Sequence, residues 1–457
     1  MRAPWGSSAS DPGDNLQASS GRSATKSVYI AISSDVLHRG HLNIIEQGAR
    51  LGEVTIGLLT DSAIATYKRA PLLDWETRRA TLVGMRNVAR VVAQDTLSYA
   101  NNLREFKPDI VLHGDDWRTG VQAVTRAEVI SVLAEYGGEL VEVAYTEGVS
   151  GTDLEAALRP ALNTIDARRG RLRKLLGLKP WLRAMEVSNG LSALIVESVR
   201  VDDPESGGAR EYDAMWVSSL CDSAFKGKPD TELVDFTSRL RTIHDIMEVS
   251  TKPIILDGDT GGKTAHFPHL IRTLERVGVS AVIIEDKTWL KQNSLLDEDA
   301  VHTLQDPHAF AAKMNAGKRA QVTDDFMIIA RLESLIAGQG LEDALTRARI
   351  YIEEGGVDGI MIHSRHSDGE EIREFLRRFR DYTTEIPVVL VPTTYNHIPE
   401  RELSDLGADI IIHANHLLRS AYPAMLRTAT KILDAGRSKE VDDEIMSIRD
   451  VVSLIPE

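Results

Sequence analysis

The sequence predicts an α/β protein with two domains, a small Rossmann-like parallel sheet followed by a (β/α)8 barrel of the TIM type. From Val28 onward, short apolar runs rich in β-branched residues alternate with helical patterns, which is typical of parallel sheets covered by helices. After Trp181, eight such runs follow one another over roughly 250 residues, the number that a TIM barrel needs. A chain of 457 residues is long enough for two or three domains.

The composition excludes several classes of protein. A formal net charge of −15 and a pI of about 5.4 argue against a nucleic-acid partner. The single cysteine, Cys221, rules out an internal disulfide framework and a cysteine-built metal site, and it fits the reducing cytosol. Because no apolar run approaches the ~18 residues of a membrane span, we expect a cytoplasmic protein without a membrane partner.

The first domain is expected over residues 27–152. Residues 1–26 are rich in Ser, Gly and Ala and lack the apolar core of a signal peptide, so we expect a disordered leader there. The strands of the domain are expected at 28–33, 54–60, 90–93, 109–116 and 139–146, and its helices at 40–51, at 75–87 and before Pro108.

Two histidines stand at the end of the first expected strand. The segment Ser33–His41 reads SSDVLHRGH and places His38 and His41 around the start of the first helix. A helix amino terminus offers N–H groups and a positive dipole that favour phosphate binding. Two imidazoles there can donate hydrogen bonds to a phosphoryl group as charge builds on it during an in-line displacement. The alternative is a chance surface pair, which the preceding strand and the intervening glycine make the weaker interpretation.

This segment resembles the HxGH motif of the nucleotidyltransferase superfamily. The stretches HGDDW (His113–Trp117) and TEGVSGT (Thr146–Thr152) resemble two further motifs of its cytidylyltransferase branch. The resemblance implies CTP as co-substrate and a role for ten residues. It assigns His38, His41 and Lys68 to the triphosphate, Asp35 to the acceptor or a metal, Asp115, Asp116 and Trp117 to the cytidine, and Thr146, Gly148 and Ser150 to the phosphates.

Two sites depart from the cytidylyltransferase pattern. Ser33 and Ser34 stand where the family usually has Thr and Phe. Tyr145 stands where the last motif of the family begins with arginine, and Lys68, Arg69 or Arg78 could replace that positive charge. The alternative for the whole domain is a nucleotidyltransferase fold that has been kept without its activity.

The second domain is expected over residues 179–457, after a helical linker at 153–178. Pro160 and Gly170 interrupt the linker, and we expect its arginine run to form a solvated face. The eight expected barrel strands are LRAMEVS, YDAMWVSS, PIILDGD, AVIIEDK, FMIIARLE, GIMIHS, VVLVPT and DIIIHAN, with helical patterns between them.

Polar residues follow nearly every strand of this expected barrel. The carboxyl ends of the strands meet at one mouth, where barrel enzymes carry their active sites. Three of the acids there, Asp257, Asp259 and Glu285, would repel one another unless they share a cation, and hard oxygen donors suit Mg²⁺ or Mn²⁺. The alternative for each acid is a solvated loop residue. The whole ring comprises Ser188, Asn189, Ser218, Ser219, Asp257, Asp259, Glu285, Arg331, Glu333, His363, Ser364, Thr393 and Asn415.

The order of these residues resembles that in phosphoenolpyruvate mutases, within the isocitrate lyase/phosphoenolpyruvate mutase superfamily. The motifs that carry the resemblance are DGDTGG, EDKTWLKQNS, ARLESLIAG and IHS. Lyases of this superfamily need a cysteine in a KKCGH-type loop, and Cys221 lies on a different loop, so carbon–carbon cleavage is disfavoured. Asn293 stands at the gating-loop position that mutases keep and phosphonopyruvate hydrolases lack.

The resemblance implies isomerisation of phosphoenolpyruvate to phosphonopyruvate with Mg²⁺ as cofactor. Asp257 would bind the ion directly, and Asp259, Glu285 and Asp230 would hold its waters. Other residues would hold the substrate itself. Arg331 and His363 would hold the phosphoryl group, Trp216, Ser218, Ser219 and Leu220 would surround the carboxylate end, and Lys291, Asn293 and Ser294 would lie on a loop that closes over the substrate.

Together the two halves resemble the bifunctional enzymes of phosphonate antibiotic biosynthesis of the fosfomycin type. One half would form the C–P bond, and the other would transfer CMP from CTP to a small phosphonate such as 2-hydroxyethylphosphonate. The resemblance also implies a homo-oligomer assembled through the barrel. The alternatives are a barrel of the phosphonopyruvate hydrolase type and a non-catalytic nucleotide-binding domain that regulates the barrel.

Overall fold

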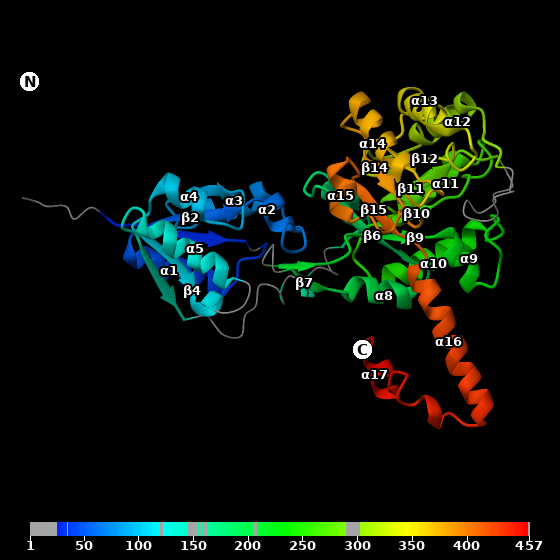
Figure 1. The fold of residues 1–457 in the computed structure, drawn as a ribbon. Coiled ribbons are helices and arrows are strands. Elements are labelled where there is room, and N and C mark those ends of the chain that lie inside the picture. Colours follow the sequence, from blue (N-terminus) through cyan, green and yellow to red (C-terminus); the bar gives the residue numbers. More distant parts are fainter. Residues whose placement is uncertain are drawn as a thin grey trace, which may run out of the picture. The chain divides into compact units, whose positions relative to one another are not determined.

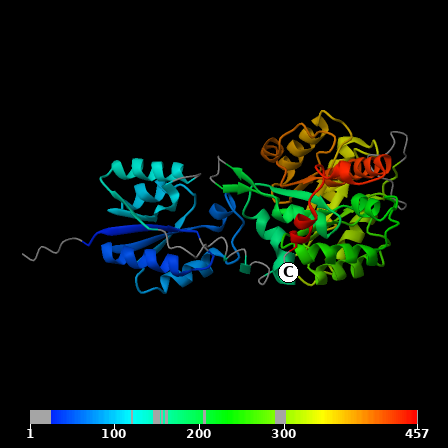
Figure 2. The ribbon, with the colours of Figure 1, turned by 90° about the horizontal axis from the view of Figure 1, so that it is seen from below.

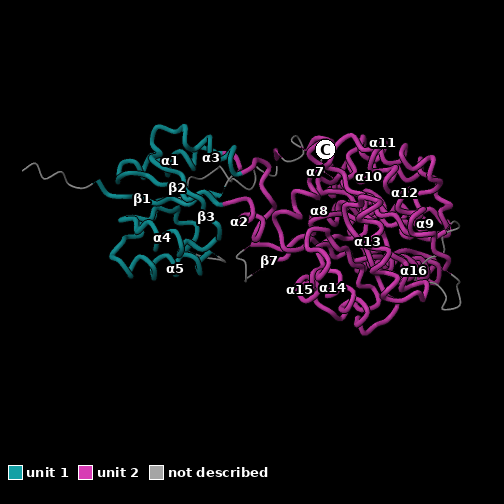
Figure 3. Tube along the Cα trace, turned by 90° about the horizontal axis from the view of Figure 1, so that it is seen from above, with its two compact units in different colours: residues 1–33, 37–59, 75–149 teal, residues 34–36, 60–74, 150–457 magenta. Residues whose placement is uncertain are grey.

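The computed structural model describes residues 25–33, 35–118, 122–144, 154, 157–158, 163–203, 208–288 and 302–455. The chain divides into two compact units, which Figure 3 colours separately. The first unit comprises residues 1–33, 37–59 and 75–149, and the second comprises residues 34–36, 60–74 and 150–457. Two short stretches from the sequence of the expected first domain therefore belong to the second unit.

The first unit is a parallel sheet with the strand order β3-β2-β1-β4-β5. This is the doubly wound order, so the predicted Rossmann-like fold is confirmed. Its strands are β1 (Ser27–Ile32), β2 (Glu53–Leu59), β3 (Arg90–Gln94), β4 (Ile110–Gly114) and β5 (Glu139–Val143). Its helices are α1 (Arg39–Leu51), α3 (Trp75–Val83), α4 (Ala100–Phe106) and α5 (Ala123–Ala134), and the short 3-10 helix η1 (Asp115–Arg118) follows β4.

A close approach between two strands of this sheet explains one glycine. A Cβ atom at Gly57 in β2 would lie 1.8 Å from the hydroxyl oxygen of Tyr29 in β1. Tyr29 is buried, and its hydroxyl donates to Gln94 Oε1 at 2.7 Å and accepts from Asn102 Nδ2 at 2.9 Å. Glycine at position 57 therefore makes room for a buried polar chain that joins β1, β3 and α4.

The second unit contains a closed barrel of parallel strands in the order β10-β11-β12-β13-β14-β15-β6-β9 (Figures 1 and 2), which confirms the predicted TIM-type barrel. The strands are β6 (Leu182–Val187), β9 (Ala214–Val217), β10 (Ile254–Asp257), β11 (Ala281–Glu285), β12 (Met327–Leu332), β13 (Gly359–Ile362), β14 (Val388–Leu390) and β15 (Ile410–His413). Outside the barrel wall, β7 (Val201–Asp203) and β8 (Gly208–Arg210) pair as an antiparallel hairpin.

Helices follow the barrel strands in turn. They are α8 (Gly190–Ser198), α9 (Ser219–Phe225), α10 (Phe236–Val249), α11 (Phe267–Val277), α12 (Pro307–Lys318), α13 (Gly340–Glu353), α14 (Glu370–Tyr382), α15 (Glu400–Asp405) and α16 (His416–Ala435). The unit also holds α2 (Asp61–Ala65), α7 (Ile165–Leu176), η2 (Lys439–Val441) and α17 (Ile448–Ser453).

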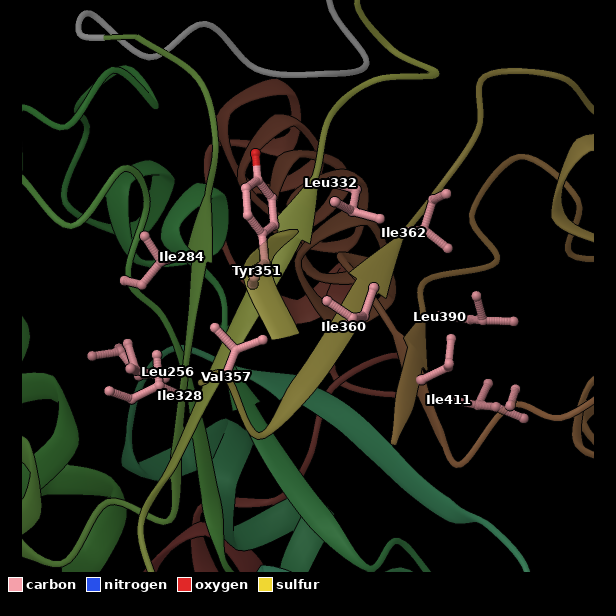
Figure 4. Packing of buried hydrophobic residues seen from close by; sticks show 14 of the residues in the cluster. Leu256, Ile284, Ile328, Leu332, Tyr351, Val357, Ile360, Ile362, Leu390 and Ile411 are labelled. Atoms are coloured by element: carbon pink, nitrogen blue, oxygen red, sulfur yellow. The ribbon is translucent and has the colours of Figure 1, made fainter. Parts of the chain in front are cut away.

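Successive residues of each barrel strand point to opposite faces, and this alternation builds two hydrophobic layers. One layer lies between the strands and the helices, and Figure 4 shows Leu256, Ile284, Ile328, Ile360 and Ile411 in it. The other layer fills the barrel interior with the neighbouring residues Ile255, Ile283, Ile329, Met361 and Ile410. The wall is thus apolar on both faces, which explains the continuous apolar runs of the sequence.

Helix α7 packs against the interior layer, at the end of the barrel where the strands begin. Its Leu172 and Leu175 belong to the interior cluster. Arg168 and Arg169 are both buried, and the backbone oxygen of Arg168 accepts a hydrogen bond from Ser280 Oγ at 2.7 Å. The expectation that the arginine run is a solvated face is wrong for these two residues, because the helix turns that face toward the barrel.

Helix α16 differs from the other long helices of the barrel. All of its residues are at least partly exposed, and Figure 1 shows the helix extending from the barrel. Its large exposed apolar side chains are those of Tyr422, Met425, Leu426, Ile432 and Leu433. This apolar surface is not a membrane span, since no helix among the described residues has both the length and the hydropathy to cross a bilayer.

Candidate active site

A cavity of about 50 Å³ lies at the carboxyl end of the barrel, and we call it the mouth pocket. The strand ends and the segments that follow them supply its walls, as in other TIM barrels. The predicted ring residues that line it are Ser218, Ser219, Asp257, Arg331, His363, Thr393 and Asn415. Trp216, Leu220 and Asp230, which the resemblance placed around the substrate, line it as well.

Asp257 is a buried carboxylate at the end of β10. Its Oδ2 accepts hydrogen bonds from Ser219 Oγ at 2.8 Å and Ser219 N at 3.3 Å, and its Oδ1 accepts from Asp259 N at 3.3 Å. These donors come from two neighbouring strand ends. They fix the carboxylate in the wall of the mouth pocket.

The side chain of Asp259 forms an ion pair with Arg239 of α10. Arg239 is itself buried and also donates to the backbone oxygen of Asp257 at 2.8 Å. The backbone of Asp259 has φ of 52°, a left-handed conformation that is uncommon for a residue with a Cβ. Arg239 therefore stabilises the sharp turn after β10 through its contacts with both Asp257 and Asp259.

Glu285 and Glu333 lie among three basic side chains behind the mouth pocket. Glu285 Oε2 is 3.7 Å from Lys287 Nζ and 3.6 Å from Arg331 Nη1. Glu333 Oε1 is 2.5 Å from Arg331 Nε and 3.2 Å from His363 Nε2, and Glu333 Oε2 is 3.1 Å from Lys287 Nζ. All five side chains are buried, so the cluster is balanced by its own charges rather than by water.

This cluster fixes the charge of each member. Burial opposes the charged form of Glu333, but Arg331, Lys287 and His363 hold the pKa of Glu333 well below its usual range. Burial also opposes the charge of Arg331, yet the carboxylates of Glu333 and Glu285 raise its pKa above the usual value. Burial and the Arg331 charge lower the pKa of His363, so its imidazole is neutral at pH 7. The site thus presents a fixed cation beside a neutral imidazole.

A second buried network supports the cluster from the side of α13. Asp286 Oδ2 accepts from Tyr351 Oη at 2.6 Å and Arg347 Nη1 at 3.3 Å, and Asp286 Oδ1 accepts from Glu333 N at 3.0 Å. Burial raises the pKa of Asp286 to about 6. Sequence analysis placed Glu333 in the ring at the mouth but assigned no specific role to it, to Asp286 or to Lys287. Arg331 and Glu333 are two residues apart at the end of one strand, and this spacing is the signal that could have linked them.

The donor set of the mouth pocket fits Mg²⁺. Among the described residues, no three His, Cys, Asp or Glu side chains converge closely enough to enclose a metal ion. Mg²⁺ keeps several of its waters and binds proteins through one or two carboxylates, so it does not require such an enclosure. Asp257 and Asp230 are the carboxylates that line the pocket, while Asp259 and Glu285 are engaged with Arg239, Lys287 and Arg331.

The other predicted residues of the barrel have different positions. Asn189 begins α8, where its Oδ1 accepts from Ser192 N at 2.9 Å, and Ser364 Oγ donates to Glu371. Lys291, Asn293 and Ser294 lie outside the described residues. A larger cavity of about 420 Å³ lies beside α10 and α11. Asp259 lines it, but Asp257, Arg331 and His363 do not. We take the mouth pocket as the site because the fixed charges converge there.

In the first unit, His38 and His41 stand at the start of α1. His38 Nδ1 accepts the Gly40 N–H at 3.1 Å, and His41 Nδ1 accepts the His38 N–H at 3.3 Å. The centroids of the two rings are 3.9 Å apart. Because both Nδ1 atoms accept, each neutral imidazole carries its proton on Nε2. The helix start therefore holds both histidines in the tautomer that donates through Nε2.

The HGDDW segment follows β4. Trp117 is buried, its ring stacks on His113 with centroids 3.7 Å apart, and its indole N–H donates to Glu142 Oε1 at 2.9 Å. Asp115 and Asp116 lie on η1, where Asp116 is exposed. Hydrogen bonds from Arg126 and Arg118 hold the pKa of Glu142 well below its usual range. Sequence analysis missed Glu142, because a single acid in a strand gives no signal.

The remaining candidate residues of the nucleotidyltransferase motifs fall into two groups. Thr146, Gly148 and Ser150 lie outside the described residues, as does Tyr145. Asp35 and Lys68 belong to the second unit. The carboxylate of Asp35 is buried and accepts hydrogen bonds from Leu72 N at 2.7 Å and Leu73 N at 3.2 Å.

Comparison with known proteins agrees with the barrel fold. Residues 172–433 match the family model described as phosphoenolpyruvate phosphomutase. The chain belongs to the phosphoenolpyruvate phosphomutase family. Residues 33–157 match a second family model, described as cytidylyltransferase-like.

Relatives of the phosphoenolpyruvate phosphomutase family include more than one activity. A phosphoenolpyruvate phosphomutase from Tetrahymena pyriformis is 34% identical over 285 residues, covering 62% of this chain and 90% of the relative. A phosphonopyruvate hydrolase from Variovorax sp. (strain Pal2) is 33% identical over 245 residues, covering 53% of this chain and 83% of the relative.

The similar solved structures carry the same two activity names. The crystal structure of phosphoenolpyruvate phosphomutase from Streptomyces platensis subsp. rosaceus is similar with a TM-score of 0.56 at 34% identity, covering 62% of this chain and 93% of that one. A phosphonopyruvate hydrolase complexed with oxalate and Mg²⁺ is similar with a TM-score of 0.53 at 30% identity, covering 64% of this chain and 94% of that one.

Proposed function

We propose that the barrel isomerises phosphoenolpyruvate to phosphonopyruvate. The observation that carries the proposal is that Arg331, His363 and Asp257 line one pocket of a phosphoenolpyruvate phosphomutase family barrel. A permanently charged guanidinium and a neutral imidazole suit a phosphoryl group, which is anionic throughout the reaction. The carboxylate of Asp257, in the lining of the same pocket, suits a divalent cation.

In this mechanism the phosphoryl group leaves the enol oxygen of phosphoenolpyruvate and bonds to C3. Arg331 and His363 hold the phosphoryl oxygens during the transfer, and Ser218 with the backbone after it orients the carboxylate end. Asp257 would hold Mg²⁺ directly, and Asp230, Asp259 and Glu285 would hold its waters. When bound, the ion would supply stabilisation of the negative charge on the substrate. The pocket must exclude water, because water would capture the phosphoryl group instead of carbon.

The distinction between a mutase and a hydrolase depends on Asn293. From the family resemblance we assign Lys291, Asn293 and Ser294 to the reaction, with Asn293 hydrogen-bonding to the phosphoryl group while it moves from the enol oxygen to C3. The specific support for a phosphonopyruvate hydrolase as second candidate is the 33% identity to the Variovorax enzyme. The two reactions share the first bond cleavage and differ in the acceptor, carbon or water.

The experiment that tests the barrel starts from phosphonopyruvate and Mg²⁺ and follows ³¹P NMR. A mutase converts the phosphonate signal to that of phosphoenolpyruvate, whereas a hydrolase gives inorganic phosphate and pyruvate. Asn293→Ala should then increase the share of phosphate. If the wild-type protein gives phosphate alone, the mutase proposal is wrong and the hydrolase is correct.

We further propose that the cytidylyltransferase-like region transfers CMP from CTP to a small phosphonate such as 2-hydroxyethylphosphonate. A phosphonate oxygen would attack the α-phosphorus of CTP and pyrophosphate would leave, while His38, His41 and Lys68 stabilise the charge on the triphosphate. The paired Nε2–H tautomers of the histidines support this role. Incubation with CTP, Mg²⁺ and a panel of phosphonates should release pyrophosphate. Binding of CTP without release would favour the regulatory alternative.

We also propose a homo-oligomer assembled through the barrel. Its support is the exposed apolar surface of α16, to which Tyr422, Met425, Leu426 and Leu433 contribute. Helix α8 has a matching exposed series on its outer face, made of Leu191, Ile195 and Val199 just after its end. Apolar surface at this density is typical of contacts between protein chains.

A further inference from the structure

The segment Tyr67–Asp74, which we call the strap, follows α2 and carries Lys68, the residue proposed to bind the triphosphate. In sequence it lies between two elements of the first unit, β2 and α3. In the structure it belongs to the second unit (Figure 3), together with the barrel. The question is what holds the strap there.

Arg69 forms the main anchor of the strap. Its Nε lies 2.7 Å from Glu211 Oε2, its Nη1 donates to Glu197 Oε1 at 2.7 Å, and its Nη2 donates to the backbone oxygen of Glu197 at 2.9 Å. The side chains of Glu197 and Glu211 are 16% and 6% exposed, and that of Arg69 is 24% exposed. A guanidinium that donates to shielded carboxylate and carbonyl oxygens is held in one position, unlike a mobile charge on the surface.

The two glutamates are held in turn by the barrel. Lys252 Nζ lies 3.1 Å from Glu211 Oε2, and Glu197 accepts from Ser250 Oγ at 2.8 Å and Thr251 Oγ1 at 3.0 Å. These three residues directly precede β10, whose far end carries Asp257. Two carboxylates therefore face two basic groups, and the pairs are complete only when Arg69 is in place.

Backbone contacts fix the strap on either side of Arg69. The carbonyl oxygen of Tyr67 accepts from Ala209 N at 3.1 Å, and that of Pro71 accepts from Lys174 Nζ at 3.0 Å. A Cβ atom at Gly208 would lie 1.8 Å from the Tyr67 oxygen, so the hairpin of β7 and β8 can reach the strap only with glycine at that position. Farther along, Asp35 accepts from the amides of Leu72 and Leu73.

We propose that Arg69 is a positioning residue for nucleotidyl transfer, which holds Lys68 by fastening the strap to Glu197 and Glu211 of the barrel unit. This rests on the proposed cytidylyl transfer. It also replaces the expectation that Arg69 could itself compensate for the missing arginine at Tyr145, because its donors are already occupied by carboxylates. Lys68 lies between two fastened residues, Tyr67 and Arg69, so its backbone position is set by the barrel.

The test uses the full chain and two substitutions that disturb the strap in different ways. Arg69→Ala removes the anchor, and Gly208→Val pushes on the Tyr67 carbonyl without changing any charge. Each should raise the KM for CTP by about tenfold, since binding of the triphosphate weakens, with a smaller effect on kcat. The conversion of phosphonopyruvate by the barrel should stay within about twofold of wild type, which excludes general unfolding. Arg210→Ala, at a side chain that is 55% exposed on the same hairpin, is the matched control and should change neither activity.

The outcomes separate this proposal from the function on which it rests. If wild type turns over CTP and both variants keep its KM, the positioning role is wrong while cytidylyl transfer stands. If both variants lose the barrel activity in parallel with CTP turnover, Arg69 is a structural residue only, and the proposal is overturned. If wild type releases no pyrophosphate with any phosphonate, cytidylyl transfer itself fails and the role of Arg69 falls with it.

Discussion

Glu333 is a fully buried carboxylate beside the residues that would hold an anionic substrate. A negative charge there disfavours a phosphoryl group, so its presence needs a physical reason. Its contacts give one: Glu333 joins Lys287, Arg331 and His363 from three different segments of the barrel. A single carboxylate thereby fixes the groups that face the mouth pocket, and this preorganisation outweighs its repulsion of the substrate.

Replacing Glu333 by Gln tests this interpretation. The change keeps the side-chain volume but removes the nearer of two carboxylates that Arg331 and Lys287 share, leaving the more distant Glu285 beside them. Loss of one member of a buried ion pair costs about 3–5 kcal/mol, so we expect the free energy of unfolding in urea to fall by about that amount. The control is Glu354→Gln, since Glu354 is half exposed and pairs with His308 on the surface. Equal unfolding midpoints for Glu333→Gln and wild type would contradict the role.

The acid side of the stability profile should depend on His363. Burial and Arg331 lower its pKa in the folded protein below the 6.5 of an unfolded chain. Between those two values the unfolded chain binds more protons, so stability rises with pH there and is lost as pH falls from 6.5 toward the folded value. Urea unfolding at several pH values should therefore show a steeper loss on acidification for wild type than for His363→Asn. Parallel profiles for the two proteins would show that His363 is not buried in its neutral form.

At the scale of elements, the loop after β10 is held by a buried lysine of α12. Lys313 Nζ donates to the backbone oxygens of Thr260 at 2.5 Å and Gly262 at 2.6 Å, and it lies over the Phe267 ring. Burial lowers the pKa of Lys313 to about 8. This lysine ties α12 to the loop that begins at Asp257.

Lys313→Met keeps the length of the side chain and removes both hydrogen bonds. The buried carbonyl oxygen of Thr260 and the partly buried one of Gly262 then lose their donor, and we expect a loss of about 1–3 kcal/mol in the free energy of unfolding. Differential scanning calorimetry or urea titration measures it. Lys263→Met, at an exposed position of the same loop, should leave the stability unchanged. A Lys313→Met protein as stable as that control would refute the contribution of the two hydrogen bonds.

The elements themselves could be predicted with good accuracy, because each barrel strand is apolar on both faces and therefore reads as a continuous run. The strand ends at Asp257, Glu285 and Arg331 were equally clear, since charge follows the apolar run abruptly. Which face of α7 packs against the barrel was not predictable. An arginine such as Arg168 can lie on a solvated face, and it can equally lie on a buried face where it donates hydrogen bonds to backbone oxygens. Only the packing of α7 against the end of the barrel where the strands begin decides between these two environments.

At the scale of the whole molecule, the proposed oligomer can be tested on α16. Met425→Glu combined with Leu426→Glu places two charges in its exposed apolar surface, which an interface between chains would have to bury. We expect the doubly substituted protein to have a lower molar mass than wild type in size-exclusion chromatography with light scattering. Arg427→Glu, on the same helix at an exposed polar position, serves as control and should keep the wild-type mass. An unchanged mass for the double variant would argue against α16 as the interface.

The sequence by itself determined the fold class of both halves, the succession of the strands along the chain and the residues that stand at their carboxyl ends. It could do so because hydrophobic periodicity and abrupt charge are local properties of the chain. The tertiary structure decided which of those residues act together. It joined Glu333 to Arg331, Lys287 and His363, engaged Asp259 with Arg239, and fastened the strap to Glu197 and Glu211. Such pairings bring together residues from different strands and loops, and their energies depend on burial and distance, which no local pattern records.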